Sequence, residues 1–303
     1  MHARSRPALL VALAVTAAAA SGTGLPAPVP VTGPGVTGTV VRYASMPSAH
    51  VEARNVDVWF PPGYGQDPDK RYPVLYMHDG QNLFDPAASY GGVDWGVDEA
   101  MTRLIEQGEV RHAIVVGVWN TQKRRQEYMP QRPVEGVVRL NIPGAPDLSA
   151  DDVVSDRYLV FLVTELKPFI DAKYRTLPYR ANTSVMGSSM GGLISQYAMS
   201  VYPEVFGGAG CVSTHWPAGD GIALDDFAAH LPDPATHRYW FDFGTATLDA
   251  SYEPYQLRAD EILRKAGYVE GQNWITKKFE GAEHSEKAWR LRVNQPLRFL
   301  IGK

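Results

Sequence analysis

The sequence contains a single cysteine, Cys211, among its 303 residues. One cysteine excludes both an intramolecular disulfide and a zinc site built on cysteines. The sequence also lacks an excess of either charge, since 29 Lys and Arg stand against 33 Asp and Glu and no basic run stands out. This balance argues against a nucleic-acid partner. Because neither a disulfide nor a cysteine zinc site is available, stability must come from a packed core, which a chain of this length can bury. We expect Cys211 to fill part of that core.

No apolar run is long enough to cross a bilayer, which takes about 20 residues. The longest run, residues 8–20, follows Arg4 and Arg6 and ends in small residues. A basic start, a short apolar stretch and small residues are typical of an export signal. We therefore predict a signal peptide at residues 1–20, a secreted or periplasmic protein, and no stable membrane insertion. Residues 21–36, rich in Pro and Gly, are predicted to form a flexible linker.

Residues 37–303 alternate between strand and helix patterns. The predicted strands are Thr37–Ser45, Asn55–Phe60, Tyr72–Met77, Ala113–Val118, Thr183–Met186, Gly208–Ser213, Tyr239–Phe243 and Trp274–Phe279. The predicted helices are Trp95–Gln107, Tyr158–Tyr174 with a kink at Pro168, Gly191–Tyr202, Pro254–Ala266 and Glu286–Ile301. This alternation predicts one α/β domain with a mostly parallel central sheet and helices on both faces. The irregular segment Asn120–Asp156 is expected to form either a loop region over the functional site or a surface insertion without a role.

The segment Gly187–Gly192 reads GSSMGG and contains one G-x-S-x-G motif centred on Ser189. A predicted strand precedes it and a predicted helix follows it, which is the setting of a nucleophile elbow. Small residues permit the sharp turn, and the helix N-terminus favours a developing oxyanion. We therefore predict Ser189 as a nucleophile and the backbone N–H of Met190 as one oxyanion donor.

The base and the acid should follow Ser189 in the order carboxylate, then histidine. His284 lies between the last predicted strand and the last predicted helix, so it can reach over the sheet toward the serine. Asp249 follows the strand Tyr239–Phe243 and is the preferred acid, with Asp242 and Glu253 left open as alternatives. His215 follows another strand and, with Trp216, is expected to line a pocket.

The second oxyanion donor should come from the loop after the third strand. That loop is His78-Asp79-Gly80-Gln81-Asn82, where Gly80 permits a tight turn that points the Gln81 amide at the site. His78 and Asp79 lack a third ligand at metal-site spacing, so no metal and no other cofactor is expected.

Together these segments resemble the "Putative esterase" family of α/β-hydrolases, which includes esterase D, feruloyl and acetylxylan esterases, siderophore esterases and antigen 85. The segments that carry the resemblance are RNVDVWFPPGY, YPVLYMHDGQNLFD, WGVDEAM, GSSMGG, FDFGTATLD and GAEHSEKAW. The resemblance implies an α/β-hydrolase fold with Ser189 as nucleophile, His284 as base and Asp249 as acid. It also implies an oxyanion hole formed by the amides of Gln81 and Met190.

These expectations combine into a secreted serine carboxylesterase that works through an acyl-enzyme. Its partner would be a small-molecule or carbohydrate ester, such as a feruloyl, acetyl or siderophore ester. We expect Trp95, Trp119, Tyr128 and Trp216 to line the acyl or sugar pocket. Two alternatives remain: acyl transfer to a sugar or lipid alcohol, and a non-catalytic binding protein on the same fold.

Overall fold

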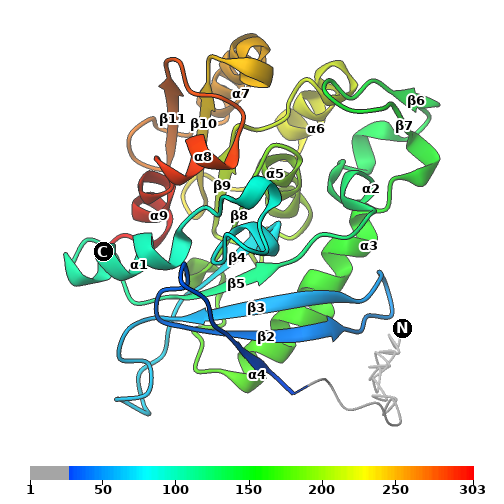
Figure 1. Ribbon diagram of the computed structural model, residues 1–303. Coiled ribbons are helices and arrows are strands. Elements are labelled where there is room, and N and C mark those ends of the chain that lie inside the picture. The colour runs from blue at the N-terminus through cyan, green and yellow to red at the C-terminus, as the bar shows by residue number, and fades with distance from the viewer. Residues whose placement is uncertain (1–26) are drawn as a thin grey trace, which may run out of the picture.

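A computed structural model describes residues 27–303 of the chain (Figure 1). The predicted signal peptide and the first residues of the predicted linker lie outside the described residues. Nine strands form one sheet in the order β1-β2-β3-β5-β4-β8-β9-β10-β11. Their bounds are β1 Val29–Val31, β2 Thr39–Met46, β3 Arg54–Phe60, β4 Val74–His78, β5 Ile114–Val118, β8 Thr183–Ser188, β9 Gly208–Val212, β10 Arg238–Gly244 and β11 Trp274–Phe279. A separate two-stranded ribbon joins β6 Arg139–Leu140 to β7 Leu148–Ser149.

The sheet is antiparallel at one end and parallel through the rest. β1, β2, β3 and β5 pair antiparallel in succession. From β5 through β4, β8, β9 and β10 to β11, every pair is parallel. All eight predicted strands are present, and the predicted α/β-hydrolase fold with a mostly parallel sheet is confirmed. Parallel strands share their carboxyl edge, so the loops after β4, β8, β10 and β11 meet there.

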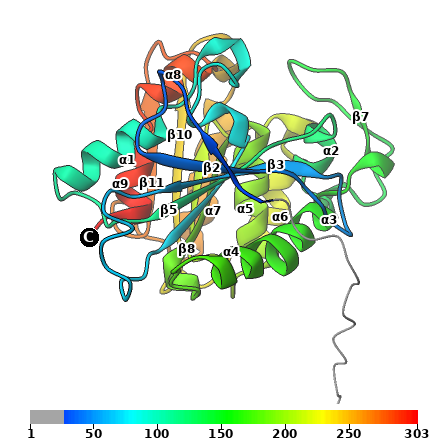
Figure 2. The same ribbon diagram turned by 60° about the horizontal axis from the view of Figure 1, so that its bottom comes forward.

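Helices cover both faces of the sheet, as predicted (Figure 2). Helices α1 and α9 pack on one face, over the side chains of Leu75 and Met77. Helices α3 to α7 lie on the other face, over Val74 and Tyr76. The alternation of strand side chains between faces explains this division. The helices are α1 Val97–Glu106, α2 Arg124–Tyr128, α3 Ser155–Val160, α4 Lys167–Lys173, α5 Met190–Val201, α6 Ala223–Ala229, α7 Glu253–Lys265, α8 Glu286–Arg290 and α9 Asn294–Ile301.

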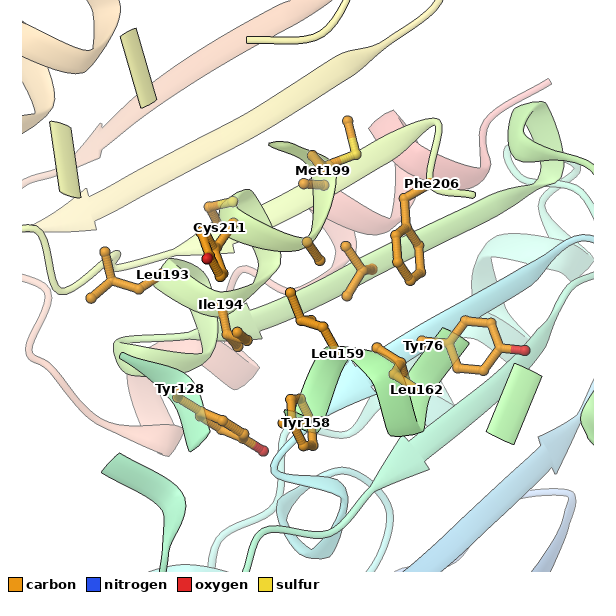
Figure 3. Close-up of a cluster of buried hydrophobic side chains, with 14 of the residues drawn as sticks. Tyr76, Tyr128, Tyr158, Leu159, Leu162, Leu193, Ile194, Met199, Phe206 and Cys211 are labelled. Atoms are coloured by element: carbon orange, nitrogen blue, oxygen red, sulfur yellow. The ribbon is translucent and has the colours of Figure 1, made fainter. Parts of the chain in front are cut away.

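The larger core lies between the sheet and helix α5. Figure 3 shows Ile194 of α5 near Leu159 of α3, and both, with Leu193, belong to one buried cluster that also includes Leu162. Cys211 of β9 lies in this cluster with no exposed surface, which confirms the prediction that it fills the core. Burial raises the pKa of its thiol, as expected of an inert core cysteine.

The predicted flexible linker is wrong for its later residues. Val29–Val31 forms the edge strand β1 and pairs with β2 from Val40 to Arg42. Pro30 cannot donate a backbone hydrogen bond, but an edge strand needs donors on one side only. A proline-rich composition therefore did not prevent strand pairing at this position.

Two predicted helices are interrupted. The helix predicted over Tyr158–Tyr174 consists of α3, a π-helical turn Phe161–Leu166, and α4. Pro168 lies in the first turn of α4, where its missing N–H costs little, so the predicted kink takes the form of the wider turn before it. The helix predicted over Glu286–Ile301 divides into α8 and α9, with Pro296 in the first turn of α9. Within residues 27–303, no helix combines the length and the apolar character that crossing a membrane would require.

Candidate active site

Ser189 lies at a sharp turn between β8 and α5. Its backbone has φ 59° and ψ −122°, a conformation that residues other than glycine rarely adopt. A Cβ atom on Gly187 would lie 2.8 Å from the carbonyl carbon of Gly191, so only glycine fits there. The turn therefore has the geometry of a nucleophile elbow, with Ser189 directly before the N-terminus of a twelve-residue helix.

His284 lies in the loop between β11 and α8, at the carboxyl edge of the sheet. Its backbone N–H donates to Thr247 Oγ1 at 2.8 Å, which ties this loop to the one after β10. The ring Nδ1 hydrogen-bonds to Asp249 Oδ1 at 2.6 Å. The Asp249 side chain has no exposed surface, whereas 13% of the His284 side chain is exposed. The two loops thus present an imidazole to the cavity with a buried carboxylate behind it.

The second oxygen of Asp249 is held by two further donors. Ser213 Oγ and the backbone N–H of Gly244 each donate to Asp249 Oδ2 at 2.6 Å. Burial alone would raise the pKa of Asp249, but the hydrogen bonds from His284, Ser213 and Gly244 outweigh it and lower the pKa. Asp249 is therefore held as an anion, with its orientation fixed.

The two alternative acids are engaged elsewhere. Asp242 is buried in β10 and forms an ion pair with Arg292 at 2.9 Å, with Trp240 Nε1 donating to its other oxygen. Glu253 pairs with Lys278 on the surface at 3.0 Å. The carboxylate that contacts His284 is thus Asp249.

Ser189 and His284 line one cavity of about 400 Å³. The other lining residues are Asp79, Gln81, Asn82, Tyr90, Asn120, Arg124, Ser188, Glu286 and Trp289. No hydrogen bond joins Ser189 to His284, both of which belong to the described part of the chain. Catalytic hydrogen bonds are often long or poorly aligned before substrate binds, so the lack of this bond does not argue against a serine–histidine pair.

The amides of Gln81 and Met190 are available to the same space. Gln81 lies in the short 3-10 turn Gly80–Asn82, and Met190 opens α5 directly after Ser189. Within residues 27–303, neither backbone N–H has a hydrogen-bond partner. Gln81 also lines the cavity. The predicted oxyanion donors are therefore both unoccupied at the edge where Ser189 lies.

Close backbone packing sets the position of the Gln81 loop. A Cβ atom on Gly80 would lie 2.4 Å from the carbonyl carbon of Gly117 and 2.7 Å from the amide nitrogen of Val118. Neither contact can be relieved by a side-chain rotation. Glycine at this position lets the loop rest directly on β5.

Replacing Gly80 with alanine is therefore expected to displace the Gln81 amide. We expect a loss of about 1–3 kcal/mol in stability from the clash, and a fall in kcat of about 100-fold from the misplaced donor. Thermal unfolding and steady-state hydrolysis of an aryl ester would measure both. Gly65→Ala is the matched control, because a Cβ there meets nothing within 4 Å. Equal behaviour of the two variants would contradict the role given to the loop.

An ion pair fixes the residue before Gly80. Asp79 has φ 57°, and Arg124 donates to its two carboxylate oxygens at 2.7 Å each. Asn120 Nδ2 adds a third hydrogen bond at 2.6 Å. Burial alone would raise the pKa of Asp79, but the charge and hydrogen bonds of Arg124 lower it. Asn120 and Arg124 come from the start of the irregular segment, which does reach the site, as one of its two interpretations predicted.

His78 turns away from the cavity. Its ring is buried and its Nδ1 hydrogen-bonds to the hydroxyl of Tyr158 at 2.8 Å. Burial lowers the pKa of His78 to about 3, so the ring is neutral. It therefore supports the core beneath the loop.

Within residues 27–303, the acidic side chains close enough together to share a cation are Asp94, Asp98 and Glu99. Arg290 already donates to Asp94 at 2.7 Å and to Glu99 at 2.8 Å. The cluster thus has an internal cation, which links α8 to the start of α1.

The predicted pocket residues lie outside the cavity lining. Trp95 is buried against Trp289, with the ring centroids 5.5 Å apart. Trp119 donates to Asp57 at 2.9 Å and stacks under Arg42. The other three predicted residues, Tyr128, Trp216 and His215, are buried. Trp216 Nε1 donates a hydrogen bond to Gln256, and His215 hydrogen-bonds to Tyr252. Large aromatic side chains gain most from burial, and here they form the support of the site.

Several lining residues were not predicted from the sequence. They include three polar residues on loops or short helices, Arg124, Asn120 and Glu286. Asn82 also lines the cavity and lies in the loop His78–Asn82, which was predicted to supply an oxyanion donor. Tyr90 is 77% exposed at the cavity. Position next to a predicted catalytic residue is the signal that could have identified Asn82 and Glu286. Nothing in the sequence places Arg124 there, because its contact with Asp79 spans 45 residues.

Comparison with known proteins adds four findings. A family model described as "Putative esterase" matches residues 48–300. The uncharacterized protein YbbA of Bacillus subtilis is 23% identical over 265 residues, covering 82% of this chain and 93% of that protein. A ferulic acid esterase from Anaeromyces mucronatus has a similar structure, with a TM-score of 0.60 and 20% identity over 92% of this chain and 93% of that one. The siderophore hydrolase EstA from Aspergillus nidulans has a TM-score of 0.62 and 17% identity, covering 86% of this chain and 94% of its own.

Proposed function

Because the chain belongs to the "Putative esterase" family, we propose that it is a serine carboxylesterase with Ser189, His284 and Asp249 as its catalytic residues. The observation that carries this proposal is the 2.6 Å hydrogen bond between Asp249 and His284, at a cavity that also holds the elbow residue Ser189. A buried carboxylate behind an imidazole beside a strained serine is the arrangement that activates a hydroxyl nucleophile.

The reaction proceeds in two halves. His284 accepts the proton of Ser189 while Oγ attacks the ester carbonyl, and the amides of Gln81 and Met190 stabilise the oxyanion. His284 then gives the proton to the departing alcohol, which leaves an acyl group on Ser189. Water attacks this acyl-enzyme, His284 accepts a water proton, and the acid is released as the proton returns to Ser189.

The lining of the cavity favours a polar ester. Arg124 lines the cavity while its Nε and Nη2 donate to Asp79. The polar side chains of Glu286, Asn82 and Asn120 line the same cavity. A hydroxyl-bearing substrate, such as an acylated sugar or a siderophore ester, could satisfy these groups. The basic and apolar start of the chain supports export to the periplasm or the medium as part of the same proposal.

A fluorophosphonate probe tests the proposal directly. We expect one covalent adduct on the peptide that contains Ser189, located by mass spectrometry, and hydrolysis of at least one ester among feruloyl, acetyl-sugar, siderophore and simple aryl substrates. Product analysis with added sugar would separate hydrolysis from transfer. A folded protein that is neither labelled nor active on any of these esters would be a binding protein instead.

A further inference from the structure

The hydroxyl of Ser213 lies at the centre of a buried hydrogen-bond network behind the catalytic residues. Ser213 follows β9 directly and has no exposed surface. Trp289 Nε1 donates to its Oγ at 3.0 Å, and Arg292 Nη2 donates to the same oxygen at 2.8 Å. The hydroxyl in turn donates to Asp249 Oδ2 at 2.6 Å. The mechanism above gives no part to Arg292 or Trp289, although both reach the acid through one atom.

The chemistry of the four groups fixes the direction of these hydrogen bonds. An indole N–H and a guanidinium can only donate, so Trp289 and Arg292 occupy both lone pairs of the Ser213 oxygen. A carboxylate anion can only accept, so the single proton of the hydroxyl is directed at Asp249. Every donor and acceptor site of the Ser213 hydroxyl is therefore used, and its orientation cannot change without breaking a buried hydrogen bond.

Arg292 is itself held by Asp242. Arg292 Nη2 lies 2.9 Å from Asp242 Oδ1, and the two side chains are 4% and 0% exposed. Trp240 Nε1 donates to the other oxygen of Asp242 at 2.8 Å. A buried ion pair adds little net stability compared with apolar side chains of similar volume. Stability alone therefore does not account for the pair, whereas the hydrogen bond that it delivers to Ser213 gives it a role.

Ser213 connects the segments that carry the acid and the base. Asp249 Oδ2 accepts from Ser213 and from the backbone N–H of Gly244, which leaves Oδ1 to face His284. Trp289 packs edge-on against the imidazole of His284, with ring centroids 4.9 Å apart and an interplanar angle of 81°. One hydroxyl thus sets how the carboxylate is turned and where α8, which follows His284, lies relative to it.

We propose that Ser213 and Arg292 are positioning residues of the esterase. Arg292, held by Asp242, fixes the Ser213 hydroxyl, and that hydroxyl holds Asp249 in the orientation in which Oδ1 accepts from His284. The imidazole must keep one tautomer and one orientation to take the proton of the nucleophile. If Asp249 is held less firmly, the ring can turn and proton transfer slows, while the ester still binds. This inference rests on the proposed function, because it acts through the acid and the base named there.

Ser213→Ala tests the role, because it removes the hydroxyl and little else. We expect kcat for an aryl ester to fall by about 10- to 100-fold, and kcat/KM to fall by the same factor, because alignment is lost in the transition state and not in binding. A second readout is the proton NMR signal of the hydrogen between His284 Nδ1 and Asp249 Oδ1, identified by isotope labelling of histidine. This signal should lie far downfield in the unmodified enzyme and move upfield in Ser213→Ala.

A double variant tests Arg292 without leaving a charge buried alone. Asp242→Asn combined with Arg292→Met removes both charges, and the asparagine keeps an oxygen for the hydrogen bond from Trp240. The variant should stay folded, because replacing a buried ion pair often costs little, but its kcat should fall by about tenfold. Arg292→Lys should lose less, because Nη2 alone contacts both Ser213 and Asp242, and an ammonium group that reaches this point can donate to both.

Ser200→Ala is the matched control. Arg132 Nη2 donates to Ser200 Oγ at 3.0 Å, and Arg132 is paired with Asp226, as Arg292 is with Asp242. Ser200 lies near the end of α5, whereas the nucleophile precedes the start of that helix. This variant should therefore leave kcat and the downfield signal unchanged.

A purely structural role for Ser213 predicts a different result. Ser213→Ala would then lower only the melting temperature and leave kcat and the downfield signal as they are in Ser200→Ala, and that result would overturn the inference. If Ser213→Ala does not fold, an unchanged kcat in the folded double variant or in Arg292→Met would overturn it equally. An unmodified protein that hydrolyses no ester and takes up no fluorophosphonate would instead refute the proposed function.

Discussion

Replacing Ser189 with alanine is expected to lower kcat for ester hydrolysis by about 10⁵-fold. The substitution removes the hydroxyl oxygen proposed to form the acyl bond, while the turn itself remains set by Gly187 and Gly191. Oxyanion donors and binding contacts stay in place, so a small rate above the uncatalysed reaction should persist. Steady-state hydrolysis of a short p-nitrophenyl ester measures the loss, and circular dichroism should show an unchanged fold.

Ser188 provides the comparison within the same turn. It is the last residue of β8 and, like Ser189, is buried at the cavity. Ser188→Ala should still be labelled by a fluorophosphonate, because the attacking hydroxyl remains. Loss of labelling in Ser188→Ala with retention in Ser189→Ala would show that the adjacent serine is the nucleophile.

Replacing Asp249 with asparagine is expected to lower kcat by about 10⁴-fold without a large change in the fold. The amide oxygen can take the place of Oδ2 and keep the hydrogen bonds from Ser213 and Gly244. The amide nitrogen then faces His284 Nδ1 and donates to it. The ring proton must move to the other nitrogen, which can no longer accept a proton from Ser189.

Glu253→Gln is the control for this substitution. Glu253 was an alternative acid, and its carboxylate pairs with Lys278 on the surface. Exposed ion pairs contribute at most about 1 kcal/mol, so this variant should keep its activity and most of its stability. A large loss of kcat in Glu253→Gln, with near-normal kcat in Asp249→Asn, would refute the assignment of the acid.

The strands were predictable because their pattern is local. Each buried strand is a short apolar run between turn residues, and all eight predicted runs form strands of the sheet. The edge strand at Val29–Val31 was not predictable in this way, because only its pairing with Val40–Arg42 stabilises it. Likewise, the π-helical turn before α4 depends on how the chain adapts to Pro168, which composition does not specify.

The candidate site was predictable where a residue lies in a loop that follows a strand, at the carboxyl edge of the sheet. Ser189, His284 and Asp249 each follow a strand, and their order in the chain places them at one edge. The pocket residues could not be derived by the same argument. Aromatic side chains such as Trp216 and Tyr128 serve both cores and pockets, and only tertiary packing decides between them. Arg124 enters the cavity through an ion pair with a distant residue, which no local pattern encodes.

Strand β1 also has a consequence for how copies of this chain meet. Without it, the eight-residue strand β2 would end the sheet with a row of free backbone donors and acceptors, a template on which another chain could add. Strand β1 covers Val40 to Arg42, and it is only three residues long, with Pro30 at its centre. A strand from another chain that paired with β1 would find few backbone N–H donors on it. The edge of the sheet at this end thus offers another chain fewer backbone groups for edge-to-edge pairing than β2 would offer alone.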